Sequence, residues 1–106
     1  MRIAIVVVIT AFACGCAENT LETIQRAEKT IPMPTSSYPL SWYDRYYAIE
    51  NGKAVGIFIT NDAHKGKAAL VASERELPYR TDGGCSVIRT ELELKTLSWR
   101  KPVCHG

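Results

Sequence analysis

The sequence predicts an α+β domain in which one short N-terminal helix packs on an antiparallel sheet of two hairpins and a short third strand. Two observations predict the hairpins. Asn51-Gly52 separates two strand-like runs, and Cys85 and Cys104 mark the ends of a second pair of strands. Apolar residues at helical spacing upstream predict the helix. The chain of 106 residues has room for one small domain of this kind.

An apolar run, Ile3 to Ala13, follows Met1 and Arg2 at the start of the chain. A positive start, an apolar stretch and small residues at its end are typical of an export signal peptide. The run is only about half of the roughly 20 residues that a membrane-spanning helix needs. We therefore expect residues 1–15 to be a signal peptide and the rest of the chain to be exported.

The sequence Ala13-Cys14-Gly15-Cys16-Ala17 resembles the bacterial lipobox, in which a cysteine that follows small residues receives lipid and becomes the new N-terminus. Gly15 favours Cys16 as the lipidated residue, whereas the bulky Phe12 two places earlier disfavours Cys14, the alternative. Two further alternatives are cleavage after Ala13 to release a soluble secreted protein, and a Cys-x-Cys metal or redox site.

Residues 16–41 are predicted to form a short helix and a connector. Asn19 followed by Glu22 has the form of a helix N-cap with its capping-box partner, and the apolar spacing predicts a helix from about Thr20 to Thr30. A helix this short is stable only if it packs on the sheet. The run Pro32 to Pro39 predicts a stiff connector, which either spaces the domain from a membrane or crosses from helix to sheet.

Residues 42–106 are predicted to form the sheet. In the first hairpin, the two-residue turn sets Glu50 opposite Lys53. Ala68 to Ala72 is predicted to be the short third strand, and the last 25 or so residues form the second hairpin. In a sheet domain this small, a disulfide is expected to contribute much of the stability.

The register of the second hairpin is predicted from its cysteines. If Leu92 lies opposite Leu97 across a four-residue loop, antiparallel counting brings Cys85 directly opposite Cys104, where a disulfide can form. A competing register, two residues along, pairs opposite charges across the strands but moves the cysteines apart. We favour the disulfide register.

That register divides the hairpin into two faces. The predicted apolar face holds Ile88, Thr90, Leu92, Leu97, Trp99, Lys101 and Val103. The predicted polar face holds Val87, Arg89, Glu91, Ser98 and Arg100. In the competing register, Glu91 would lie opposite Arg100.

Composition and motifs give little support for catalysis or nucleic-acid binding. The net charge is only +2 and the basic residues are scattered, so we expect no nucleic-acid partner. Asp62 and His64 share a polar turn and resemble a base with its orienting partner, but no nucleophile accompanies them. We expect no cofactor, no metal site and no enzyme; a small secreted hydrolase that uses Asp62 and His64 is the alternative.

Residues typical of binding hot spots concentrate at the start of the sheet region, and two arginines lie on the polar face of the second hairpin. Because side chains alternate along a strand, Tyr46 and Tyr47 cannot both point inward. The expected partner surface comprises Trp42, Tyr43, Tyr46, Tyr47, Arg89 and Arg100.

Three short segments, Asp44-Arg45-Tyr46-Tyr47, Asp82-Gly83-Gly84-Cys85 and Cys104-His105-Gly106, together with the lipobox, resemble small uncharacterised lipoproteins of Gram-negative bacteria. The resemblance implies a palmitate-bearing lipid anchor. It also implies outer-membrane sorting with the domain facing the periplasm, because Ala17 is not the acidic residue that retains such proteins at the inner membrane. We expect a membrane-anchored envelope lipoprotein that binds an envelope protein partner as an inhibitory or structural accessory.

Overall fold

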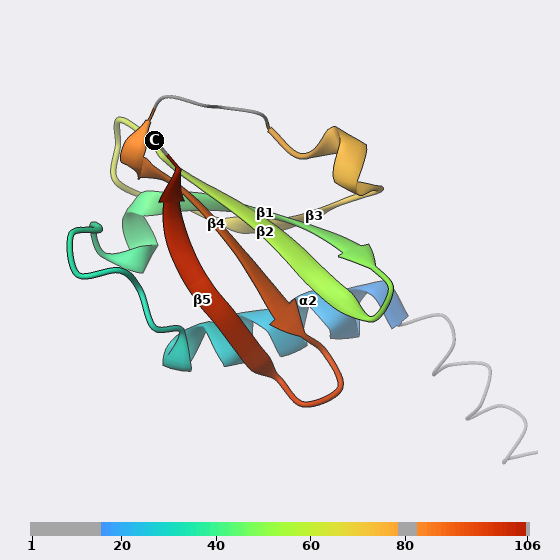
Figure 1. Ribbon diagram of the computed structural model, residues 1–106. Helices are drawn as coiled ribbons and strands as arrows, with labels where there is room; N and C mark the ends of the chain where they lie inside the picture. Colours follow the sequence, from blue (N-terminus) through green and yellow to red (C-terminus); the bar gives the residue numbers. More distant parts are fainter. Residues whose placement is uncertain (1–15, 79–82, 106) are drawn as a thin grey trace, which may run out of the picture.

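The computed structural model describes residues 16–78 and 83–105 and confirms the α+β class, with one helix against a five-stranded sheet (Figure 1). The predicted signal peptide lies outside the described residues. Helix α2 is followed by a short 3-10 turn, and two more such turns precede β1 and follow β3. The elements are α2 (Cys16–Ala27), η1 (Glu28–Thr30), η2 (Leu40–Trp42), β1 (Tyr43–Glu50), β2 (Lys53–Thr60), β3 (Ala68–Val71), η3 (Glu74–Glu76), β4 (Gly84–Glu93) and β5 (Ser98–His105).

The sheet has the strand order β3-β1-β2-β4-β5 and is mixed, which corrects the wholly antiparallel prediction. β3 pairs with β1 in parallel, from Arg45 opposite Ala68 to Ala48 opposite Val71. The cause is the loop of residues 61–67, which crosses the start of β1 and places β3 on its far side. The loop reverses the direction of the chain, so β3 runs antiparallel to β2. Because β1 also runs antiparallel to β2, β3 runs parallel to β1.

The first hairpin has the predicted register, with Glu50 opposite Lys53 and Tyr47 opposite Gly56. Asn51 and Gly52 both have positive φ, 52° and 78°, as a two-residue turn of this twist requires. A methyl group on Gly56 would lie 2.9 Å from the Tyr47 ring. Glycine is therefore needed at this position because the aromatic ring lies directly on the backbone.

The second hairpin has the competing register near its turn, so the favoured register is wrong there. Glu91 lies opposite Arg100, and the strands close through residues 94–97. Cys85 and Cys104 nevertheless form the predicted disulfide, with 4.5 Å between their Cα atoms. The strand pairing is irregular in two places, between Gly84 and Ile88 and between Arg89 and Glu91. These two irregularities change the register between the turn and the disulfide.

The second irregularity also corrects two predicted face assignments. Between Arg89 and Glu91 on β4 there is one residue, whereas the facing part of β5 holds two, Lys101 and Pro102. Proline cannot donate a ladder hydrogen bond, so it is suited to a bulge of this kind. With this extra residue in β5, Pro102 is buried. Lys101 and Val103 were predicted for the apolar face, but both are exposed. Leu97, predicted for the same face, is exposed in the turn.

The core lies between α2 and one face of the sheet, as predicted. Its buried members are Ile24, Ala27, Tyr43, Tyr47, Ala54, Phe58, Ile88 and Leu92. The helix begins at Cys16, earlier than expected, so Asn19 lies inside it and the predicted N-cap is wrong. Ala17 and Glu18 are good helix formers, which favours continuing the helix over capping it at Asn19.

The proline-rich connector folds back onto the domain and provides the crossing from helix to sheet. The Ser37 amide donates to the Pro34 carbonyl in a tight turn, and Met33 packs against the core. The Ser36 hydroxyl lies 3.2 Å from the Cys85 sulfur. These contacts do not fit an extended spacer, the other alternative that the sequence left open.

The opposite, outer face of the sheet is covered only in part. The segment after β3 crosses it, and Glu74 of η3 pairs with Arg89 of β4 at 3.4 Å. The Glu74 amide also donates to Glu50. Beneath the crossing, apolar residues of β1 and β2 are buried, whereas the β4–β5 side is left partly open. The outer-face residues that are buried are Ala48, Val55, Ile57 and Val87.

Candidate functional site

Two of the four predicted surface aromatics are core residues, which removes them from the expected partner surface. Tyr43 and Tyr47 are both 0% exposed, because residues four apart on a strand share a face and both point toward α2. Trp42 and Tyr46 are half-buried. The alternation rule predicted that Tyr46 and Tyr47 lie on opposite faces, and the structure confirms it.

Tyr47 ends in a buried polar network that the sequence did not indicate. Its hydroxyl donates to Glu28 at 2.6 Å, and the same carboxylate oxygen accepts from Arg45 Nε at 2.7 Å. Burial, with the Glu28 charge as a second cause, raises the pKa of Tyr47 far above its ordinary value. Glu28 lies four residues after Ile24, on the buried stripe of the helix, and that spacing was the available signal. The network holds the helix on the sheet.

Tyr43 links the connector to the disulfide. Its hydroxyl donates to the Cys85 carbonyl at 2.5 Å and accepts from the Tyr38 amide at 3.1 Å. Burial raises the pKa of Tyr43. The hydroxyl is therefore committed to two backbone groups and has a structural role.

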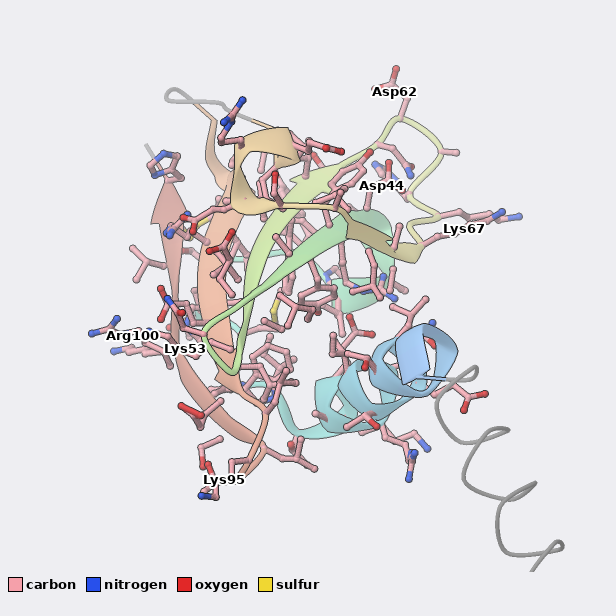
Figure 2. The ribbon with its side chains drawn as sticks, turned by 90° about the vertical axis from the view of Figure 1, so that its right-hand side faces the viewer. Asp44, Lys53, Asp62, Lys67, Lys95 and Arg100 are labelled. Atoms are coloured by element: carbon pink, nitrogen blue, oxygen red, sulfur yellow. A yellow bond between two sulfur atoms is a disulfide. The ribbon has the colours of Figure 1, made fainter. Side chains whose placement is uncertain are left out.

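His64 belongs to a stack of aromatic rings. Its ring lies parallel to Trp42 at a centroid distance of 3.8 Å, and Tyr38 stacks at 5.3 Å from Trp42. Asp62 projects into solvent at the top of Figure 2. Among the residues that the structure describes, no hydrogen bond or ion pair joins Asp62 to His64, and no three acidic, histidine or cysteine residues form a metal site.

The loop that carries His64 is held closely against the start of β1. Asn61 donates to Asp44 at 3.2 Å and to the Lys65 carbonyl at 2.8 Å. A side chain at position 66 would overlap the backbone of Tyr43, so only glycine allows the loop to pass this close to β1. The loop therefore positions the His64 ring on Trp42, and this geometry gives no support to the pairing of Asp62 with His64 as a catalytic base.

The two predicted arginines do lie together, on the open part of the outer face. Glu91 Oε1 is 3.4 Å from Arg100 and 3.5 Å from Lys53, and Glu91 Oε2 is 3.9 Å from Arg89. Figure 2 shows Arg100 and Lys53 side by side on the side of the molecule away from α2. One carboxylate therefore holds three cationic side chains in a cluster.

Around this cluster the surface is hollowed. One hollow of about 150 Å³ is lined by Arg89, Thr90, Glu91, Arg100, Lys101 and Val103. A second, of about 290 Å³, is lined by Lys53, Glu91, Glu93, Ser98 and Arg100. Arg100 and Glu91 border both. We define the outer patch as six of the residues that line these hollows: Lys53, Arg89, Glu91, Arg100, Lys101 and Val103.

Sequence reasoning missed half of this patch. Lys101 and Val103 were expected on the apolar face, and only the bulge at Pro102 brings them to the outer surface. Lys53 belongs to the other hairpin and reaches the patch because β2 lies beside β4. Pro102 in the middle of a strand was the one signal that a bulge interrupts the pattern.

No helix in the described part of the chain is long and apolar enough to cross a membrane. Comparison of the sequence and structure with protein-family models, with curated proteins and with solved structures finds no match in any of the three.

Proposed function

We propose that the protein is a membrane-anchored envelope lipoprotein whose outer patch binds an acidic surface of a protein partner, as an inhibitory or structural accessory. One observation carries the proposal. Val103 is 60% exposed, the highest value among the exposed large apolar residues in the described part of the chain, and it lines the same hollow as Arg89, Arg100 and Lys101. An apolar centre with a charged rim is the usual anatomy of a protein interface.

The two most accessible cations of the patch favour an acidic partner. The patch holds four cations, Lys53, Arg89, Arg100 and Lys101. The carboxylates in or beside it are also four, Glu50, Glu74, Glu91 and Glu93, and they lie mainly around Lys53 and Arg89. Within the described residues no ion pair involves Lys101, and the Arg100 side chain is 75% exposed. Both are therefore available to carboxylates of a partner.

Arg100 is expected to determine how well the partner binds. A photo-reactive amino acid at Val103 should crosslink the partner in intact cells, and Arg100→Glu in the same chain should abolish that crosslink by turning an attractive charge into a repulsive one. The readout is the crosslinked band, followed by identification of the acidic peptide that it contains.

The matched control is Lys65→Glu, which makes the same change of charge on the exposed loop that carries His64. It should leave the Val103 crosslink unchanged, since the loop lies outside the patch. Equal loss in both variants, or a crosslinked peptide without acidic residues, would rule out the outer patch as the recognition surface.

The anchor is proposed from the lipobox-like sequence that ends at Cys16. We expect the mature N-terminus to be a lipid-modified Cys16, which intact-mass and N-terminal peptide analysis would show directly. Cys16→Ser should yield an unprocessed or soluble chain, whereas Cys14→Ser should leave the lipid in place. An unmodified mature chain that begins at Cys14 would contradict the anchor and would leave a secreted protein.

A further inference from the structure

We propose that β3 is a docking edge for a second copy of this chain, which adds its own β3 antiparallel to the first and so joins the two sheets. The surface in question, which we name the β3 edge, is the backbone of Ala68 and Leu70 on the side away from β1. β3 carries no residue of the outer patch and lies at the opposite edge of the sheet from β5. The inference therefore goes beyond the proposed function and does not depend on it.

The first step is the direction of the backbone groups of β3. The Arg45 amide donates to the Lys67 carbonyl at 2.8 Å, and Arg45 lies opposite Ala68 in the parallel register. In such a pair the residues on either side of Ala68 bond to β1, and the groups of alternate residues point to the other edge. Ala68 and Leu70 therefore direct their N–H and C=O groups away from β1. Within residues 16–78 and 83–105, β1 is the only strand that pairs with β3, so these groups have no strand partner.

The second step is a comparison of the two edges of the sheet. β5 has features that prevent strand addition, because Pro102 lacks an N–H, a bulge interrupts the pairing, and Lys101 is exposed and charged. β3 has none of these features. Its four residues are uncharged, include no proline and pair with β1 in an unbroken register. Two copies joined at β3 leave only β5 at each outer edge, so the assembly stops at a dimer.

The third step is the fit of β3 to itself. With a two-fold axis at Ala69, Ala68 of each copy lies opposite Leu70 of the other, and each of these pairs exchanges backbone hydrogen bonds. Ala69 lies opposite Ala69 of the second copy in the closer, non-hydrogen-bonded kind of pair, with Cα atoms about 4.5 Å apart. A small side chain suits this position. Lys67 lies opposite Val71 of the second copy, so no like charges oppose each other along the strand.

The fourth step is the charge at the two ends of β3. Lys65 and Lys67 are exposed at its start, and Figure 2 shows Lys67 pointing away from the body of the molecule. Two carboxylates lie near them, but Asp44 already accepts from Asn61 and from the Lys67 amide, and Asp62 projects from the tip of the loop. The end of β3 is acidic, with three carboxylates and two cations: Glu50, Glu74, Glu76, Arg75 and Arg89. Antiparallel pairing sets the lysines of each copy beside the acidic end of the other.

The test introduces one cysteine at a time into the purified full-length chain under mild oxidation. Ala69→Cys should form a disulfide-linked dimer, because the two positions 69 meet at the axis with a spacing that a disulfide can bridge. Ala72→Cys is the matched control, since Ala72 is more exposed but lies three residues from the axis, about 20 Å from its symmetry mate. The unmodified chain gives the background from its own cysteines. Non-reducing electrophoresis and peptide mapping should show at least about tenfold more dimer, linked at position 69, for Ala69→Cys than for Ala72→Cys.

A second variant tests the edge itself. Ala68→Pro removes an outward N–H and leaves the bonds to β1 in place, so it should abolish the dimer of the Ala69→Cys chain while urea denaturation still shows a folded domain. A folded Ala68→Pro chain that still forms the dimer overturns the β3 edge. If Ala68→Pro does not fold, the two cysteine variants decide alone: equal dimer yields, or no dimer in either, overturn the proposal. A disulfide from position 69 to a different protein overturns pairing with a second copy.

Discussion

Replacement of Glu28 by alanine is expected to destabilise the domain by about 3–5 kcal/mol, because it leaves Arg45 as a buried charge without its partner. The side chains of Arg45 and Glu28 are only 11% and 6% exposed and are joined at 2.7 Å. The Tyr47 hydroxyl would lose its acceptor as well. The free energy of unfolding from urea denaturation measures the effect, which is a large share of what a small domain possesses.

Glu22→Ala is the matched control, since Glu22 is an exposed residue of α2, the helix that leads directly into η1 and Glu28. It should change the unfolding free energy by no more than about 0.5 kcal/mol. A double variant, Glu28→Leu with Arg45→Met, should recover much of the loss, because an apolar pair of similar volume avoids the cost of burying two charges. Similar losses for Glu28→Ala and Glu22→Ala would show that the network does not hold the helix on the sheet.

The parts of the fold that could be predicted are those fixed by neighbouring residues. Asn51-Gly52 determines the type of the turn that it forms, and the register of the first hairpin follows from that turn. The placement of β3 beside β1 depends on the path of the 61–67 loop, on which local pattern carries no information. The second hairpin combines both cases: the disulfide was predicted correctly, but through a regular ladder that the structure interrupts twice.

The candidate site shows the same division. Arg89, Glu91 and Arg100 share a face in both registers, so their grouping survives the error in pairing. The stack of Trp42 on His64 joins a residue before β1 to one in the loop after β2, and no sequence period links them. Glu28 was missed for another reason: a charged residue is normally assigned to the surface, and its buried partner comes from a strand.

Loss of the Cys85–Cys104 bond is expected to lower the free energy of unfolding by about 2–5 kcal/mol. The two cysteines are 19 residues apart, and closing a loop of this length restricts the unfolded chain by an amount worth about 3 kcal/mol. The bond also joins the strands where the ladder is interrupted, between Gly84 and Ile88, so no regular hydrogen bonding replaces it there. Urea denaturation of Cys85→Ala and of the double Cys85→Ala, Cys104→Ala variant measures the loss.

The double variant matters because a single substitution leaves Cys104 as a free thiol, which can form other disulfides. Reduction of the unmodified protein should reproduce the double variant, since both open the same loop. The Tyr43 bond to the Cys85 carbonyl and the ladder from Arg89 to Glu93 do not involve the sulfur atoms, so the reduced protein should keep the same strands. A reduced protein as stable as the oxidised one would mean that these backbone contacts, and not the cross-link, hold the end of the hairpin closed.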